Sequence, residues 1–146
     1  MIKEAFFPTF VYAKDINLDL NLMTNAIVEW SKKDKGLVKT NVKGWHSPTN
    51  MHTIPVFNSL FSGAYYIKVP NNSGFLKIND PRQGTHFIKP ARKDGIPIYL
   101  APEVHIEPKE NRIIMFPSWL EHCVEMNESD DIRISVSFNF LQDGFQ

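Results

Sequence analysis

The sequence has one cysteine, no basic stretch and no long apolar run, and each shortage excludes something. Cys123 has no second cysteine to pair with, which excludes a disulfide within these residues and favours a reducing compartment, the cytoplasm. Lys and Arg number 16, as do Asp and Glu, so no excess of positive charge favours nucleic acid as a partner. No stretch approaches the ~18 apolar residues of a membrane span, so we expect no membrane partner.

The length and the apolar content predict a single domain. With 146 residues, 42% of them hydrophobic, the chain can bury one core. We expect residues 1–57 to form an N-terminal helix and support region and residues 58–146 to supply the core strands.

Only one segment has the periodicity of a long helix. Leu18, Leu22, Ala26 and Trp30 recur at fourfold spacing, and residues 31–36 end the pattern. The rest of the chain reads as short strands and turns.

Three later regions predict strands. Residues 62–69 and 75–78, joined by the turn Pro70–Gly74, are expected to form a hairpin, and residues 104–107 and 112–116 a second one. Residues 132–140 alternate strictly, so that the apolar side chains share one face of a strand and Arg133, Ser135, Ser137 and Asn139 share the other.

These elements predict an all-β fold with a leading α-helix, either a sandwich or a jelly roll. The stretch Gln83–Pro102, which contains Pro90, Gly95, Pro97 and Pro102, predicts either a functional lid or a plain surface loop.

The strongest chemical signal is the run Phe116–His122, followed eleven residues later by Arg133. A neutral imidazole is a good ligand for Fe(II), and a guanidinium is a bidentate partner for a carboxylate. From the residues alone, His122 can equally be a hydrogen-bonded structural histidine and Arg133 a residue on a solvated sheet face.

Four motifs in order carry a family resemblance: residues 62–70, Asp80-Pro81-Arg82, residues 116–122 and residues 133–139. The series resembles a 2-oxoglutarate/Fe(II)-dependent oxygenase family of bacteria and marine phages, within the prolyl-hydroxylase-like superfamily, and residues 41–47 resemble its N-terminal region. The resemblance implies a double-stranded β-helix, the cupin-like jelly roll, with Fe(II) as cofactor and 2-oxoglutarate as co-substrate.

The resemblance also implies roles for individual residues. His122 matches the distal iron-ligating histidine, and Arg133 matches the base that binds the far carboxylate of 2-oxoglutarate, which Ser135 could share. Tyr66 matches a tyrosine whose hydroxyl assists in related hydroxylases, and an ordinary core aromatic is the alternative.

The chain departs from the family pattern where the other two metal ligands are expected. The family has a His-x-Asp, His-x-Glu or histidine-rich segment there, whereas this chain has His52 followed by Ile54 at the acid position. His52 is the substitute ligand or else a surface or capped histidine. The family stretch is longer and includes another strand, so Phe57-Asn58 is interpreted as the point of an internal deletion.

Two nearby patterns are interpreted as structural. His105-Ile106-Glu107 has the His-x-Glu form but lies where the family has no ligand. Cys123 adjoins His122, but neighbours on a strand face opposite ways, which disfavours a Cys/His nucleophilic pair.

The expected function is therefore that of a non-haem Fe(II)/2-oxoglutarate dioxygenase that hydroxylates a small molecule or a protein side chain, impaired by the missing segment. The alternative is a non-catalytic jelly-roll binding or structural module derived from that family. A homodimer is a third hypothesis, because a missing strand leaves a sheet edge exposed.

Overall fold

The structure, a computed structural model, describes residues 9–36, 59–82, 98 and 101–141. Within these ranges the elements are β1 (Tyr12–Asp15), α1 (Leu20–Lys33), β2 (Ser59–Lys68), β3 (Leu76–Asn79), β4 (Glu103–Ile106), β5 (Arg112–Pro117), β6 (His122–Val124) and β7 (Ile134–Leu141).

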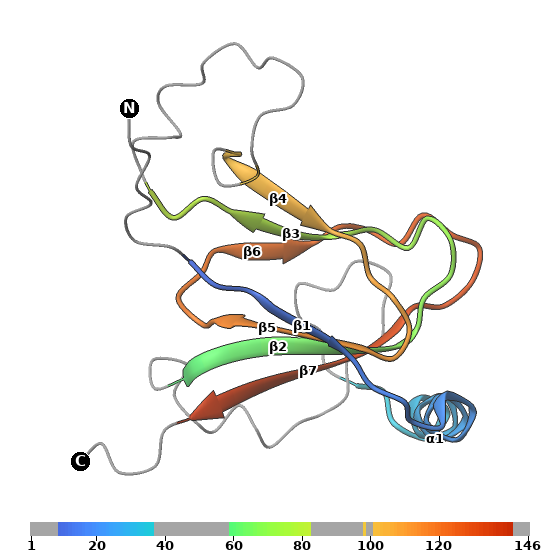
Figure 1. The fold of residues 1–146 in the computed structure, drawn as a ribbon. Helices are drawn as coiled ribbons and strands as arrows, with labels where there is room; N and C mark the ends of the chain where they lie inside the picture. The colour runs from blue at the N-terminus through green and yellow to red at the C-terminus, as the bar shows by residue number, and fades with distance from the viewer. Residues whose placement is uncertain (1–8, 37–58, 83–97, 99–100, 142–146) are drawn as a thin grey trace, which may run out of the picture.

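The strands form two antiparallel sheets that pack face to face (Figure 1). One sheet has the order β1-β5-β2-β7, and the other has the order β4-β3-β6. The prediction of a mostly β fold with a leading helix is confirmed at the level of a sandwich. Among the described residues, none of the helical segments has the length and apolarity needed to cross a bilayer.

Both predicted hairpins are wrong. β2 and β3 lie in different sheets, and so do β4 and β5, so each turn carries the chain from one layer to the other. The first connection contains Asn72 and Gly74, with φ values of 60° and 80°, and the second contains Asn111 at 63°. Turn residues in the sequence therefore marked a change of direction correctly, but they did not say whether the next strand would pair with the last.

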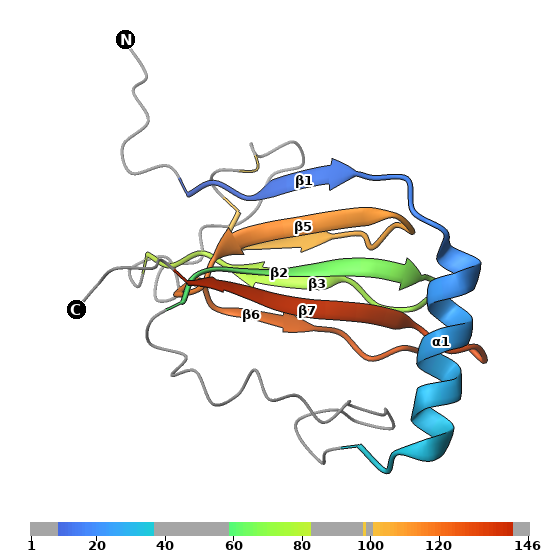
Figure 2. The same cartoon turned by 90° about the horizontal axis from the view of Figure 1, so that it is seen from below.

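Helix α1 covers the outer face of the four-stranded sheet, across one end of its strands (Figure 2). Asp19 caps it by accepting a hydrogen bond from the backbone N–H of Leu22 at 3.0 Å. Leu20, Met23 and Ile27 pack against the sheet. Leu22, which belongs to the fourfold stripe that predicted the helix, is 69% exposed, so the structure buries the neighbouring face of the helix.

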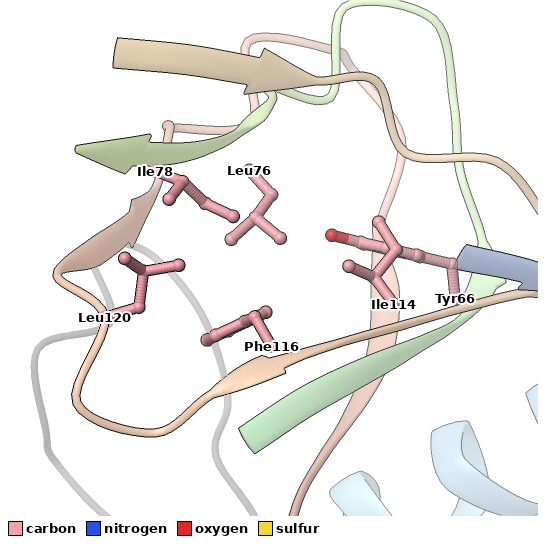
Figure 3. Packing of buried hydrophobic residues seen from close by; sticks show 6 residues of the cluster. All are labelled: Tyr66, Leu76, Ile78, Ile114, Phe116 and Leu120. Atoms are coloured by element: carbon pink, nitrogen blue, oxygen red, sulfur yellow. The ribbon is translucent and has the colours of Figure 1, made fainter. Parts of the chain in front are cut away.

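Alternation along β2 divides the buried side chains between two cores. Tyr66 packs between the sheets with Ile114, Phe116 and Leu120 (Figure 3). Tyr65 and Ile67, its neighbours in sequence, face the helix instead. The four-stranded sheet is thus covered by packed side chains on both of its faces.

Strand β7 has its polar face toward the other sheet. Its pairing with β2 sets Ser135 opposite Tyr66 and Ser137 opposite Ala64, both of which belong to the inter-sheet side. Its apolar face lies on the helix side, where the ring of Phe138 covers Gly63 so closely that a Cβ atom there would collide with it. The alternation predicted the strand correctly, and the fold then placed the polar face inside.

Strand β1 was not among the segments predicted by alternation. It pairs with β5 at the far edge of the same sheet. Asp15, at its end, forms ion pairs with Arg112 at 2.7 Å and Lys109 at 2.8 Å. These two cations hold the pKa of the Asp15 carboxyl well below its usual range.

Two isoleucines test the inter-sheet core. Ile114 is completely buried and Ile132 is 51% exposed. We predict that Ile114→Ala lowers the free energy of unfolding by about 2–5 kcal/mol, because a fully packed side chain leaves a cavity, whereas Ile132→Ala changes it by less than about 0.5 kcal/mol. Urea unfolding followed by circular dichroism measures both, and equal losses would contradict the packing described here.

Candidate carboxylate-binding site

The candidate site lies at the side of the sandwich where β7 and β6 are the edge strands of their sheets. In Figure 2 both lie on the same side of the molecule, opposite β1. Arg133 immediately precedes β7, and His122 begins β6. The two residues that the sequence singled out therefore begin the edge strands on this side of the two layers, and these strands run in opposite directions (Figure 1).

Arg133 reaches from the four-stranded sheet to the loops beside the other sheet. Its Nη1 donates hydrogen bonds to the carbonyl of Ser73, just before β3, and to the carbonyl of Glu125 at 3.2 Å, just after β6. Both acceptors are neutral, and no carboxylate of the described residues pairs with this guanidinium. Burial lowers the pKa of Arg133, since a half-buried cation loses hydration, although an arginine stays protonated in proteins.

Tyr66 brings an unsatisfied hydroxyl to the same place. Its side chain is 2% exposed, and its hydroxyl has no hydrogen-bond partner in the part of the chain that the structure describes. Burial raises the pKa of Tyr66, and the positive charge of Arg133 opposes that rise. A buried hydroxyl without a partner costs free energy, so a ligand oxygen here would be stabilised.

Ser135 shares the face of Tyr66, because these two residues are directly opposite in the β2–β7 pair. Its side chain is exposed although it points toward the layer between the sheets. The structure therefore places Arg133, Tyr66 and Ser135 on the same side of the four-stranded sheet: one cation and two hydroxyls, with no carboxylate of the described residues paired to the cation. Such a set is suited to a carboxylate.

His122 also points toward the layer between the sheets. It is paired with Ile78 of the inter-sheet core, and its ring makes an edge contact with Phe116 at 4.5 Å between centroids. Its Nδ1 lies 2.7 Å from the carbonyl oxygen of Leu120. Because a carbonyl can only accept, Nδ1 is the donor in this contact, and in the neutral imidazole Nε2 is then the nitrogen with a free lone pair; metal-binding histidines are oriented in this way.

His122 and one acceptor of the Arg133 guanidinium are close in the chain. Glu125, whose carbonyl accepts a hydrogen bond from Arg133, is three residues after His122, so the α-carbons of His122 and Glu125 are at most about 10 Å apart.

The described residues do not complete an iron site. They contain no group of three His, Cys, Asp or Glu side chains that could hold a metal ion. His122 supplies one ligand, whereas a facial triad needs three. His52, the predicted second ligand, lies outside the described residues, as does nearly all of the predicted lid at 83–102.

The two patterns interpreted as structural lie away from the inter-sheet layer. His105 is on the outer face of the three-stranded sheet, 3.3 Å from Glu103 and 3.2 Å from Glu125, and Glu107 falls beyond the end of β4. Cys123 faces outward as well. It is paired with Lys77, which lies between the inward-facing residues Leu76 and Ile78 of β3.

Sequence reasoning missed the backbone carbonyls of Ser73 and Glu125, because a carbonyl has no side-chain signature. One signal does mark them. Gly74 has a φ of 80°, and a Cβ atom there would lie 2.7 Å from the carbonyl oxygen of Glu125 and 2.6 Å from that of Met126. Only glycine allows the close approach of backbones that presents both carbonyls to Arg133.

The sequence model of the family described as "Putative 2OG-Fe(II) oxygenase" matches residues 41–139, well over half of the chain. No curated protein matches the chain.

Adjacent tyrosines on β2 test whether the hydroxyl of Tyr66 is unsatisfied. The hydroxyl of Tyr65 donates to the Asn111 side-chain oxygen at 2.6 Å, so Tyr65→Phe should lower the free energy of unfolding by about 1–2 kcal/mol. Tyr66→Phe removes a hydroxyl without a partner and should be neutral or stabilise by up to about 1 kcal/mol. Urea unfolding compares them; a loss in Tyr66→Phe that matches Tyr65→Phe would show that Tyr66 has a partner.

Proposed function

Because the chain belongs to the 2OG-Fe(II) oxygenase family, we propose that it is a 2-oxoglutarate-dependent Fe(II) dioxygenase that hydroxylates a small molecule or a protein side chain. The single observation that carries the proposal is that, among the described residues, the guanidinium of Arg133 has no carboxylate partner and the hydroxyl of Tyr66 has no hydrogen-bond partner. This pair supports binding of 2-oxoglutarate through its far carboxylate.

The proposed binding mode assigns a task to each residue. Arg133 uses Nη1 for the two carbonyls, and its remaining N–H groups are proposed to bind the carboxylate. Tyr66 donates its hydroxyl to the same group, and Ser135 adds a second hydroxyl from the facing position on β7. Burial strengthens these charge-assisted hydrogen bonds, because less water competes for them.

Fewer residues support the proposed iron site than support the proposed carboxylate site. His122, with Nε2 unprotonated, is proposed as one iron ligand and His52 as another. The described residues offer no third ligand, so they do not fit a complete Fe(II) triad by themselves. The connections that cross between the sheets, β2–β3, β4–β5, β5–β6 and β6–β7, support the finer assignment of the sandwich as a double-stranded β-helix.

A second function has a specific observation in its favour. One inward-facing histidine without a metal-binding group among the described residues is what a non-catalytic module would retain after losing the first ligand segment. Such a module would still bind dicarboxylates through Arg133. Binding and turnover are therefore tested separately.

The binding experiment compares two arginines. Arg82, exposed and paired with Asp80, is the control for Arg133. We predict that Arg133→Gln weakens 2-oxoglutarate binding about 10–100-fold, the equivalent of a lost hydrogen bond to a charged group, while Arg82→Gln leaves it unchanged. Isothermal titration calorimetry measures the affinity.

Arg133→Lys separates the effect of the charge from the effect of the bidentate guanidinium geometry, because lysine keeps the charge and lacks that geometry. Its affinity should be intermediate. Circular dichroism establishes that each variant is folded. Equal affinities for wild type, Arg133→Gln and Arg82→Gln would remove the carboxylate site from the proposal.

The turnover experiment compares two histidines on opposite faces of the three-stranded sheet. We predict that Fe(II)- and 2-oxoglutarate-dependent formation of succinate is abolished in His122→Ala and retained in His105→Ala, because only His122 faces the layer between the sheets. A folded wild-type protein that binds 2-oxoglutarate but neither Fe(II) nor Mn(II) at micromolar concentration would favour the non-catalytic module.

A further inference from the structure

Among the described strands, β7 is the longest at a sheet edge, and none of its side chains opposes pairing with a further strand. It runs for eight residues, and only β2 pairs with it among the described strands. No charged residue and no proline lies between Ile134 and Leu141. Proteins usually protect such an edge with a charge, a proline, a bulge or a covering segment, because its free N–H and C=O groups recruit another strand.

The other three edge strands carry such features. β1 contains Lys14 and Asp15, and β4 contains Glu103 and His105. β6 has only three residues. Among the four described edge strands, β7 is therefore the one that is long and carries no charged side chain. Its side chains do not oppose pairing with an added strand.

From these observations we propose that a second copy of this chain pairs antiparallel with β7, so that the two four-stranded sheets form one continuous sheet across a two-fold axis. The strand is complementary to itself. An axis perpendicular to the sheet keeps the two faces in place, so Ile134, Val136, Phe138 and Phe140 meet the same apolar set of the partner. The polar face meets the polar face, and the uncharged strand sets no like charges opposite each other.

Exposed apolar surface beside the edge favours the same partner. Val136 is 40% exposed and Phe140 is 53% exposed, and both belong to the apolar face of β7. A second copy brings an identical apolar strip against this surface, in addition to the backbone hydrogen bonds. Burial of that strip stabilises the pair in proportion to the apolar area removed from water.

The pairing is tested with matched substitutions at the two edges of the same sheet. Val136 lies on β7 and Val11, 38% exposed, lies just before β1 at the opposite edge. Sedimentation equilibrium of the wild type should give twice the 16.8 kDa mass of one chain at high micromolar concentration. Val136→Lys should stay at the mass of one chain under the same conditions, and Val11→Lys should behave as the wild type does.

Hydrogen exchange of the wild type supplies a readout that does not depend on the folding of any variant. Protection of amides in peptides covering 134–141 should rise with protein concentration, while peptides from β4 should not change. A wild type that is monomeric throughout overturns the proposal, and so does a dimer that Val136→Lys leaves intact. A monomer in which the β7 amides are nevertheless protected shows that another part of the same chain covers the edge, which also overturns it.

Discussion

The pairing of β2 with β5 on one side and β7 on the other is the interaction on which the rest of the structure depends. Because side chains alternate along a strand, this register sends Tyr66 between the sheets and Tyr65 under the helix. It also turns the polar face of β7 inward. A slip by one residue would place Ser135 beneath α1 and Val136 beside Tyr66, and the candidate site would no longer exist.

The candidate site consists of polar groups that lie beside the packed apolar core. Ile114, Phe116 and Leu120 fill the layer between the sheets, and Arg133, Tyr66 and Ser135 lie where β6 and β7 end the two layers. Two backbone carbonyls hold the guanidinium without neutralising it. An arginine positioned by neutral acceptors keeps its charge for a ligand, whereas one paired with an aspartate, such as Arg112, is already satisfied.

The sequence indicated the main residues of the candidate site but not the groups that surround them. His122 and Arg133 stand in motifs that resemble the family, and the family match over residues 41–139 supports that assignment. Their surroundings could not be predicted, because they depend on the backbone carbonyls of Ser73 and Glu125 and on the fact that no described residue binds the Tyr66 hydroxyl. The roles of all these residues, and of His52, stay predictions.

Local patterns in the sequence determined the helix, the strand at the C-terminal end and the positions of the turns. Each depends on residues close together in the chain: Asp19 at a helix start, strict alternation after Ile132, and Asn72 and Gly74 at a reversal. Only the tertiary structure decided which strands pair, which face of α1 is buried and that the polar face of β7 points inward. Strand pairing joins residues far apart in sequence, and its free energy comes from packing of the whole sandwich, so the neighbours of a residue in the chain do not encode it.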